Sequence, residues 1–589
     1  MKSGIYGLAA LDGAPLDPRD RALLFPAGEA GLLAAPGCAM AARDHDQRAI
    51  HADGDGDDLC LLLGELHEPA ADARRLGLDP GTPPVRLVAA AHDRWGVDAS
   101  TRLSGEWLLV RWHGAARTLT LLMSECARDD CYFAVASGRI AVAPELTRLA
   151  DLSWVDDGFD DEMLTRSMAR FPLRMGYEGR TILKGVNRLV AATMVTIRAE
   201  GVVTQSAAPV PPPPLLDIGF EEAMAQVESL LRTIMRRRLK GAGDVAFLLS
   251  GGLDSSLLAC LGAEEAGSGQ RLHFLTSAAP ADSGIADETG WAALVADHLN
   301  VPLTRVVPPA DVDVYAPTPR MLALWEAPVA SPRHYLYRAF EDEAVARGAG
   351  SIFDGSFGEL TISSPGFYLD SPFKSPRGMA RAARDGLRAM AQGRAKALEG
   401  QFHVQLAPGL FADLARGARA PVEAPRRLRP GEPFGFEAGR AKAMRQDVAA
   451  SDPRTRYSLP LRDSRLARLV ASFPAGFAVH DGAPRAMIRA LLRGRVPDRI
   501  ALRECKMAFS PTFEPMLRQQ AGAARERIAA QREAGAGDWL DLAWLDETLG
   551  RVTTSYSLNA DQAFRVQSTA IAAEFFRWWR DRKIAPTAA

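Results

Sequence analysis

Residues 247–256 read FLLSGGLDSS, and the helix-like run LLACLGA follows at 257–263. An apolar strand that leads through two glycines into a helix is how a parallel α/β sheet forms an anion site. The glycines let backbone N–H groups approach phosphate oxygens, and the helix N-terminus carries partial positive charge. Asp254 adds a carboxylate where a magnesium ion could bridge to those phosphates. The stretch therefore predicts a strand, a phosphate-binding turn and a helix.

The turn differs from the common nucleotide-binding motif. That motif is GxxxxGK[ST], whose lysine reaches the terminal phosphates, and no such lysine follows Gly252. The pattern SGGxDS resembles instead the pyrophosphate loop of the ATP pyrophosphatases. This resemblance implies that ATP is split between its α and β phosphates and that an acyl group is adenylated. The alternative is a glycine-rich turn before a buried helix, and the complete motif behind a hydrophobic strand favours the loop.

Length and composition set the broad class of the protein. At 589 residues the chain exceeds what one hydrophobic core usually supports, so we expect two domains. Its hydrophobic content is 47%, and its formal net charge of −2 gives no overall attraction to nucleic acid or to an anionic membrane. The six cysteines include no CxxC pair, as is typical of reduced thiols. Neither a membrane span nor a signal peptide is evident, so we expect a cytoplasmic protein with access to ATP.

The proline-rich stretch AAPVPPPPLLD at 207–217 is the clearest linker, because consecutive prolines continue neither a helix nor a central strand. We therefore expect a domain at 1–208, a linker at 209–217 and a second domain at 218–589. Before the linker, helical patterns near 85–95 and 159–171 interrupt short strand-like runs, which indicates an α+β domain with antiparallel sheets. Those runs are at 59–66, 106–112, 118–124, 131–137 and 192–197.

After the linker, strands alternate with helices, which favours a parallel sheet with helices on its faces. The strands are expected at 245–250, 273–277 and 351–355, and the helices near 219–240, 287–299 and 335–347. From about residue 376 the pattern is nearly all helical.

Further stretches resemble the asparagine synthetase family, in the order in which that family has them. They are SGIYG at 3–7, LLGELHE at 62–68, residues 103–135, EGRTILKGVNRLVAATMVTI at 178–197, SGGLDSS at 250–256, RGAGSIFDGSFGEL at 347–360, RYSLPLRDSRL at 456–466 and RVPDRIALRECKMAFSP at 495–511. The resemblance implies an α+β glutaminase-like sandwich of the Ntn type. An α/β ATP-pyrophosphatase domain, similar to the adenine nucleotide α-hydrolases, would follow it and end in a helical part.

Two departures from the family pattern bear on which amine would attack the activated carboxyl group. A glutaminase of this type needs a cysteine as its free N-terminal residue, whose α-amine acts as base for its own thiol. The aligned position is Ser3, preceded by Lys2, and the nearest cysteine is Cys38. We therefore expect a first domain that supports the second without hydrolysing glutamine. The second loop, 354–359, is one residue shorter than in β-lactam-forming synthetases, lacks their tyrosine, and is similar to that of the lasso peptide cyclases.

The resemblance thus implies a lasso peptide cyclase. Such an enzyme adenylates an Asp or Glu side chain of a precursor peptide with ATP. It then forms an isopeptide (macrolactam) bond with the N-terminal amine of the same peptide, and AMP and pyrophosphate are released. The implied partners are the precursor peptide, a leader peptidase and a leader-recognition protein. A β-lactam synthetase-like or asparagine synthetase-like ligase of a small molecule is the alternative, and an inactive scaffold is the third reading. The absence of RNA-binding motifs argues against nucleic acid.

The same resemblance assigns roles to individual residues. Pyrophosphate would be held by the N–H groups of the first loop, at Ser250, Gly251, Gly252, Asp254, Ser255 and Ser256. Adenosine would contact Leu249, Thr276 and Gly355. Magnesium would be shared by Asp254 and either Glu359 or Asp354.

Lys506 matches the family lysine that stabilises the developing oxyanion and the departing phosphate, although a surface lysine is the alternative. The general base stays open among Glu326, Asp287, Glu288 and Glu359, and the pair at 287–288 could equally be an acidic first turn of a helix.

Residues 370–430 contain 12 Arg or Lys against 5 Asp or Glu. Arg377, Arg381, Arg384 and Arg388 recur there at helical spacing and would line one face. This face is either a solvated helix surface or a groove for a peptide substrate or a partner protein.

Overall fold

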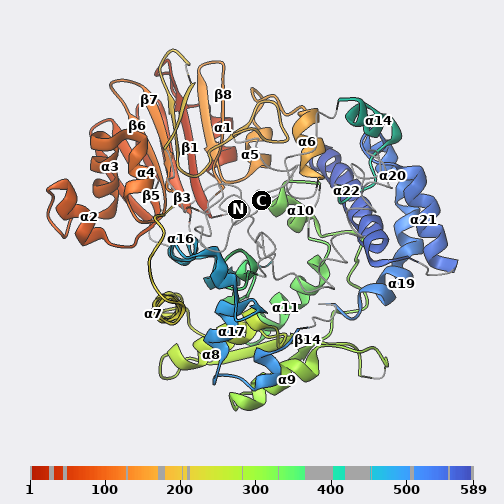
Figure 1. Ribbon diagram of the computed structural model, residues 1–589. Coiled ribbons are helices and arrows are strands. Elements are labelled where there is room, and N and C mark those ends of the chain that lie inside the picture. Colours follow the sequence, from red (N-terminus) through yellow and green to blue (C-terminus); the bar gives the residue numbers. More distant parts are fainter. Residues whose placement is uncertain are drawn as a thin grey trace.

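The computed structural model describes residues 3–25, 32–43, 50–125, 127, 130–169, 179–201, 203–208, 213–281, 283–328, 331–364, 402–417, 452, 454–504, 510–554 and 558–584. Their strands form two six-stranded sheets, one five-stranded sheet and a two-stranded ribbon. Figure 1 shows the two larger sheets together, the third sheet with its helices below them, and a group of C-terminal helices to one side.

The two six-stranded sheets are antiparallel and lie before residue 208. The order in the first is β10 (Asn187–Arg188), β8 (Tyr132–Ala136), β9 (Arg139–Ala143), β1 (Gly4–Ala10), β3 (Cys38–Arg43) and β2 (Leu33–Ala35). The order in the second is β12 (Val203–Ala207), β11 (Thr193–Ile197), β7 (Thr118–Met123), β6 (Gly105–His113), β5 (Asp58–Leu66) and β4 (Ile50–Asp55).

Strand β5 shows why its sequence is apolar without alternation. Leu61 and Leu63 belong to the core between the two sheets. Leu62, on the opposite face, belongs to the core under helices α2 (Pro69–Leu76), α3 (Pro84–Trp95) and α4 (Ala99–Arg102). Successive side chains of a strand point to opposite faces, so a strand that is covered on both faces is apolar at every position. The region is a sandwich of two sheets, with α2, α3 and α4 on one outer face and α1 (Pro18–Leu24) and α5 (Leu146–Ala150) on the other.

The third sheet is parallel. Its strand order is β15 (Leu303–Val306), β14 (Leu272–Ser277), β13 (Val245–Leu248), β16 (Ser351–Phe353) and β17 (Arg456–Ser458). All four residues of β13 are buried. Ala246 and Leu248 pack into one core and Val245 and Phe247 into another, because helices cover both faces.

Helices make up most of the remainder of the second half. Those near the third sheet are α7 (Phe220–Leu239), α8 (Leu253–Glu265), α9 (Thr289–His298), α11 (His334–Ala346), α16 (Ser464–Ala471), α17 (Ala486–Leu492) and α18 (Asp498–Ala501). The C-terminal group contains α19 (Phe513–Glu526), α20 (Ile528–Glu533), α21 (Leu542–Thr554) and α22 (Ala560–Ile584) (Figure 1). The described helices include none whose length and apolar composition would let it cross a membrane.

The strands and helices predicted between residues 59 and 347, and the strand predicted at 351–355, are confirmed with small differences at their ends. Much of the helical stretch predicted from about residue 376 lies outside the described residues, and its described part also contains strand β17. The strand expected at 245–250 ends at Leu248, because the backbone turns at the glycines. The helix expected near 159–171 is α6 (Asp161–Ser167), where Asp160 caps the first turn. Within the linker, 209–212 lie outside the described residues, so the domain boundary placed there stays a prediction.

Candidate functional site

The order of strands in the parallel sheet indicates where a ligand would bind. From β13 the chain proceeds through β14 to β15 on one side, and later places β16 and β17 on the other side. In such sheets ligands bind beyond the carboxyl ends of the strands, where the direction of winding reverses. Here that point lies between β13 and β16. The loops that leave these two strands are 249–252 and 354–359.

The first loop needs glycine where it turns. Gly251 has φ +66°, and a Cβ there would lie 2.5 Å from the carbonyl carbon of Trp291. Gly252 then caps α8. Ser250 and Ser255 brace the turn, because the N–H of Ser250 donates to the Ser255 hydroxyl over 3.2 Å and the N–H of Gly252 donates to the Ser250 hydroxyl over 3.3 Å.

These bonds correct one expectation about the loop. The sequence assigned all N–H groups of 250–256 to pyrophosphate. In the structure those of Ser250, Gly252 and Ser256 are hydrogen-bonded within the loop and the first turn of α8. An anion would therefore be held by the other amides of this stretch, at the start of the helix.

The second loop packs directly on Asp254. A Cβ on Gly355 would lie 3.0 Å from the Asp254 Cβ, and a Cβ on Gly358 would lie 2.0 Å from its Oδ1. Ser363, just beyond this loop, donates from its hydroxyl to Asp254 Oδ2 over 3.3 Å. The two loops therefore meet at one carboxylate, and the glycines of the second loop are what allow the approach.

The two carboxylates of the second loop have different surroundings. Asp354 is buried, and its Oδ1 accepts hydrogen bonds from the N–H and the hydroxyl of Ser356, over 2.8 and 2.9 Å, which fixes the shape of the loop. The Glu359 side chain is 55% exposed, and its Oε1 lies 4.0 Å from Nη2 of Arg485. Of the two, Glu359 is the better placed to accept a ligand.

The donor set suits magnesium in one respect. Mg²⁺ is usually held by one or two protein carboxylates together with substrate phosphates and water, and Asp254 with Glu359 would supply two carboxylates. Within the part of the chain that the structure describes, no three His, Cys, Asp or Glu side chains gather into a metal site of their own.

The residues expected around adenosine lie at strand ends on the same side of the sheet. Leu249 is buried, and its N–H donates to the carbonyl of Leu275 over 2.8 Å. Thr276, at the end of β14, is 2% exposed, and its hydroxyl has no hydrogen-bond partner among the described residues. A buried hydroxyl without a partner is unfavourable, and a nucleotide at the strand ends could supply one.

A sequence-family comparison covers this region. The family model described as asparagine synthase matches residues 226–579, which is more than half of the chain and includes both loops. The chain belongs to the asparagine synthase family. This assignment supports an ATP-dependent, amide-forming enzyme.

Two curated fungal proteins are similar to part of the asparagine synthase-family chain. "Amidase chyE" of Penicillium rubens is 27% identical over 288 residues, which are 44% of this chain and 39% of that protein. "Amidase chry2" of Gibberella zeae is 25% identical over 287 residues, or 44% and 40%. The chain thus spans about two fifths of the length of these relatives.

Two solved structures are also similar, with TM-scores of 0.22 and 13% identity each. One is the glutamine phosphoribosylpyrophosphate amidotransferase of B. subtilis, matched over 46% of this chain and 59% of that chain. The other is described as the allosteric regulatory enzyme of purine biosynthesis, matched over 55% and 72%. A TM-score of 0.22 is too low to establish a shared fold.

Three arginines that the sequence reading missed surround the paired loops of the asparagine synthase domain. Arg485 donates to the Ser363 hydroxyl over 3.2 Å. The guanidinium carbon of Arg462 lies 5.3 Å from the ring centre of Phe357, in the second loop. Arg503 lies behind the first loop, where it pairs with Glu288. Arg462 and Arg503 fall within the family-like stretches at 456–466 and 495–511, and this position could have marked them as site residues. Arg485 had none.

Three of the candidate general bases have structural partners. Burial alone would raise the pKa of Asp287, but hydrogen bonds from the Ala279 and Thr289 backbone and the charge of Arg305 together lower it, so this carboxylate is a poor proton acceptor. Glu288 is occupied by Arg503, as noted above. Glu326 is 4% exposed, and its Oε1 accepts from the N–H of Thr147 in the sandwich, over 3.3 Å. Glu359 is the candidate whose carboxylate faces solvent.

Two of the expected features lie outside the described residues. They are Lys506 and the arginine-rich stretch with Arg377, Arg381, Arg384 and Arg388. Their roles stay predictions. Cys38, the cysteine nearest to Ser3, is buried in β3, and burial raises the pKa of its thiol to about 12, so this thiol is a poor nucleophile.

The sandwich and the asparagine synthase domain are joined by ion pairs, which we call the seam. Arg237 of α7 lies 2.7 Å from Glu65 at the end of β5. Arg468 of α16 pairs with Glu125, next to β7. Figure 1 shows α16 between the strands of the sandwich and the helices below. Within the asparagine synthase domain, Arg238 of α7 lies 3.6 Å from Asp463, the N-cap of α16.

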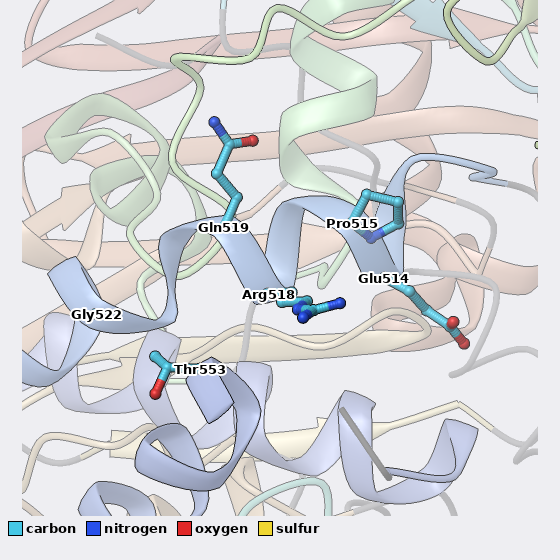
Figure 2. Close-up of a pocket in the computed structure, with 6 residues that line it drawn as sticks. All are labelled: Glu514, Pro515, Arg518, Gln519, Gly522 and Thr553. Carbon is cyan, nitrogen blue, oxygen red and sulfur yellow. The ribbon is translucent and has the colours of Figure 1, made fainter. Parts of the chain in front are cut away.

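A separate hollow of about 690 Å³ lies on the C-terminal helices. Its lining comes from α19 and the end of α21, and consists of Glu514, Pro515, Arg518, Gln519, Gly522 and Thr553 (Figure 2). None of these residues belongs to the paired loops. The hollow is therefore not the ATP site that the sequence predicts.

Proposed function

We propose that the chain is an ATP-dependent amide ligase that adenylates a carboxyl group and releases pyrophosphate. The observation that carries the proposal is the meeting of the two loops on Asp254 at the switch point of the parallel sheet. An anion site at a helix start, a carboxylate within it and a second carboxylate opposite are what nucleotide activation of an acid requires.

In this proposal the protein residues mainly position the reactants and stabilise charge. The substrate carboxylate attacks the α-phosphorus of ATP, which gives an acyl adenylate and pyrophosphate. Amides at the start of α8 hold the pyrophosphate. Asp254 and Glu359 would hold Mg²⁺, which would neutralise phosphate charge. An amine then attacks the acyl carbon, so that an amide and AMP form and one proton is lost. Lys506 is proposed to stabilise the oxyanion of this second step.

The amine is proposed to belong to the substrate itself. Ser3 stands where the related glutaminases need a thiol, and Cys38 is buried with a raised pKa. Release of ammonia from glutamine therefore has no thiol nucleophile at this position. The finer proposal is a lasso peptide cyclase, which joins an Asp or Glu side chain to the N-terminal amine of the same peptide. The short second loop, Asp354 to Glu359, supports this choice over a β-lactam-forming enzyme.

A peptide substrate also requires partners. A leader peptidase would expose the amine, and a leader-recognition protein would deliver the precursor. The excess of Arg and Lys at 370–430 supports a groove for such a chain.

The proposal is tested by incubating the full chain with ATP, Mg²⁺, a leader peptidase and candidate precursor peptides. The expected result is AMP release together with a peptide that has lost one water, detected by mass spectrometry. Asp254→Ala should abolish both signals. Asp297→Ala, a change of the same kind at an exposed position of α9, should leave them intact.

The other readings give different outcomes in the same assay. AMP release with aspartate and ammonia as the only active substrates would contradict the peptide proposal and indicate a small-molecule ligase. Bound ATP that is never converted to AMP by any carboxylate would indicate a scaffold.

A further inference from the structure

The back of the first loop is held by a buried arginine. Arg503 Nη1 donates to the carbonyl oxygens of Ser250 and Gly251, over 3.3 and 3.0 Å. Its Nη2 lies 2.5 Å from Oε1 of Glu288. The side chains of Arg503 and Glu288 are only 5% and 6% exposed, so solvent weakens neither contact much.

Trp291 also contacts Arg503 behind the first loop. The guanidinium carbon of Arg503 lies 4.6 Å from the Trp291 ring centre, so the ring helps to fix the plane of the fork. The backbone of Trp291 is also what a Cβ on Gly251 would strike. Glu288 and Trp291 both belong to the start of α9, so one helix end positions the arginine and the loop together.

The geometry of the peptide group gives this arrangement its consequence. In a trans peptide the C=O of one residue and the N–H of the next point in opposite directions. Because Arg503 draws the carbonyls of Ser250 and Gly251 to the back of the loop, the N–H of Gly251 points forward and that of Gly252 points to the Ser250 hydroxyl. Glycine peptides have little steric preference of their own. A flip of either plane would turn a carbonyl oxygen toward a bound anion.

We propose that Arg503, held by Glu288, is a positioning residue that sets the peptide planes of the first loop for pyrophosphate. The inference rests on the proposed function, because it assumes that this loop binds pyrophosphate. The charge of Arg503 is balanced by Glu288, so its role is to direct donors rather than to attract the anion. Lysine cannot replace it, since a single ammonium does not present the fixed fork that reaches two carbonyls and a carboxylate.

The test compares two substitutions on the same Trp291 ring. Arg503→Lys removes the fork. Arg499→Lys is the matched control, because Arg499 is exposed and its guanidinium carbon lies 5.6 Å from that ring. Isothermal titration of the full chain measures the dissociation constants of inorganic pyrophosphate and of AMP. Arg503→Lys should weaken pyrophosphate binding by about tenfold or more and leave the dissociation constant of AMP within about twofold of the wild type. Arg499→Lys should change neither dissociation constant.

Glu288→Gln separates positioning from attraction. It removes the carboxylate charge that faces Arg503, so an attractive role would strengthen pyrophosphate binding, whereas a positioning role weakens it. If Arg503→Lys fails to fold, this second variant decides the question alone.

The outcomes divide the two proposals. Three results would overturn the role of Arg503 and leave the proposed function standing. They are equal losses of affinity for pyrophosphate and AMP, unchanged pyrophosphate binding in Arg503→Lys, and tighter pyrophosphate binding in Glu288→Gln. A wild-type chain that binds neither ligand overturns both. A chain that binds pyrophosphate as expected but cyclises no peptide overturns the peptide substrate only.

Discussion

Replacement of Gly358 by alanine should separate the two loops of the proposed ATP site. The new Cβ would lie 2.0 Å from Asp254 Oδ1 and 3.0 Å from Cδ1 of Leu461. Cβ atoms essentially never approach a neighbour more closely than 3.0 Å, so a contact of 2.0 Å requires the carboxylate or the loop to shift by about 1 Å. Such a misplacement in a reaction that depends on positioning costs ~100-fold in rate.

The effect on folding should be smaller than the effect on catalysis. Overpacking in a well-filled site typically destabilises by about 1–3 kcal/mol, so Gly358→Ala should remain folded. AMP formation is measured at saturating ATP, and thermal unfolding is followed in parallel.

Gly290→Ala is the matched control, because a Cβ at Gly290, in α9, meets nothing within 4 Å. The reasoning is refuted if Gly358→Ala keeps activity within about threefold of the wild type, or if Gly290→Ala loses as much.

Three further predictions concern stability and reactivity. Burial lowers the pKa of His334 from 6.5 to about 4, so on acidification the unfolded chain protonates this imidazole at a higher pH than the folded chain does. The free energy of unfolding should therefore fall by up to about 3 kcal/mol as the pH drops from 6.5 through 4. Urea unfolding at pH 7 and pH 4.5 measures this, and His334→Gln should flatten the difference. Cys38 and Cys60 should resist iodoacetamide at pH 8 in the native protein, since burial raises the pKa of each thiol to about 12; peptide mass spectrometry checks this, and labelling at the rate seen in urea would contradict it. Arg237→Ala should cost at most about 1 kcal/mol, because its ion pair with Glu65 is 34% and 52% exposed; a loss above about 3 kcal/mol in urea unfolding would be inconsistent with this.

Local patterns predicted much of the fold. The unbroken apolar run at 59–66 indicated a strand, and it is β5 because both of its faces are covered. FLLSGGLDSS indicated the turn from β13 into α8, because the need for glycine at a left-handed φ is a property of the chain itself. These features depend on neighbours in sequence, where periodicity and turn chemistry apply.

The partners of the site residues were not predictable in the same way. Glu288 was an acidic residue at a helix start, and the structure pairs it with Arg503, which is 215 positions away. The 2.0 Å approach at Gly358 depends on how two separate strands are ordered in the sheet. Such contacts arise from tertiary packing, and a single sequence contains no periodic signal for them.

The seam has a consequence for any attempt to isolate the ligase half. A fragment that begins after the linker would keep Arg237 and Arg468 but lose Glu65 and Glu125, leaving positive charge on a newly exposed face. The same α16 that carries Arg468 is capped by Asp463. The residue before this cap, Arg462, lies over the ring of Phe357 in the second loop. Deleting the sandwich should therefore also disturb the two loops of the proposed ATP site.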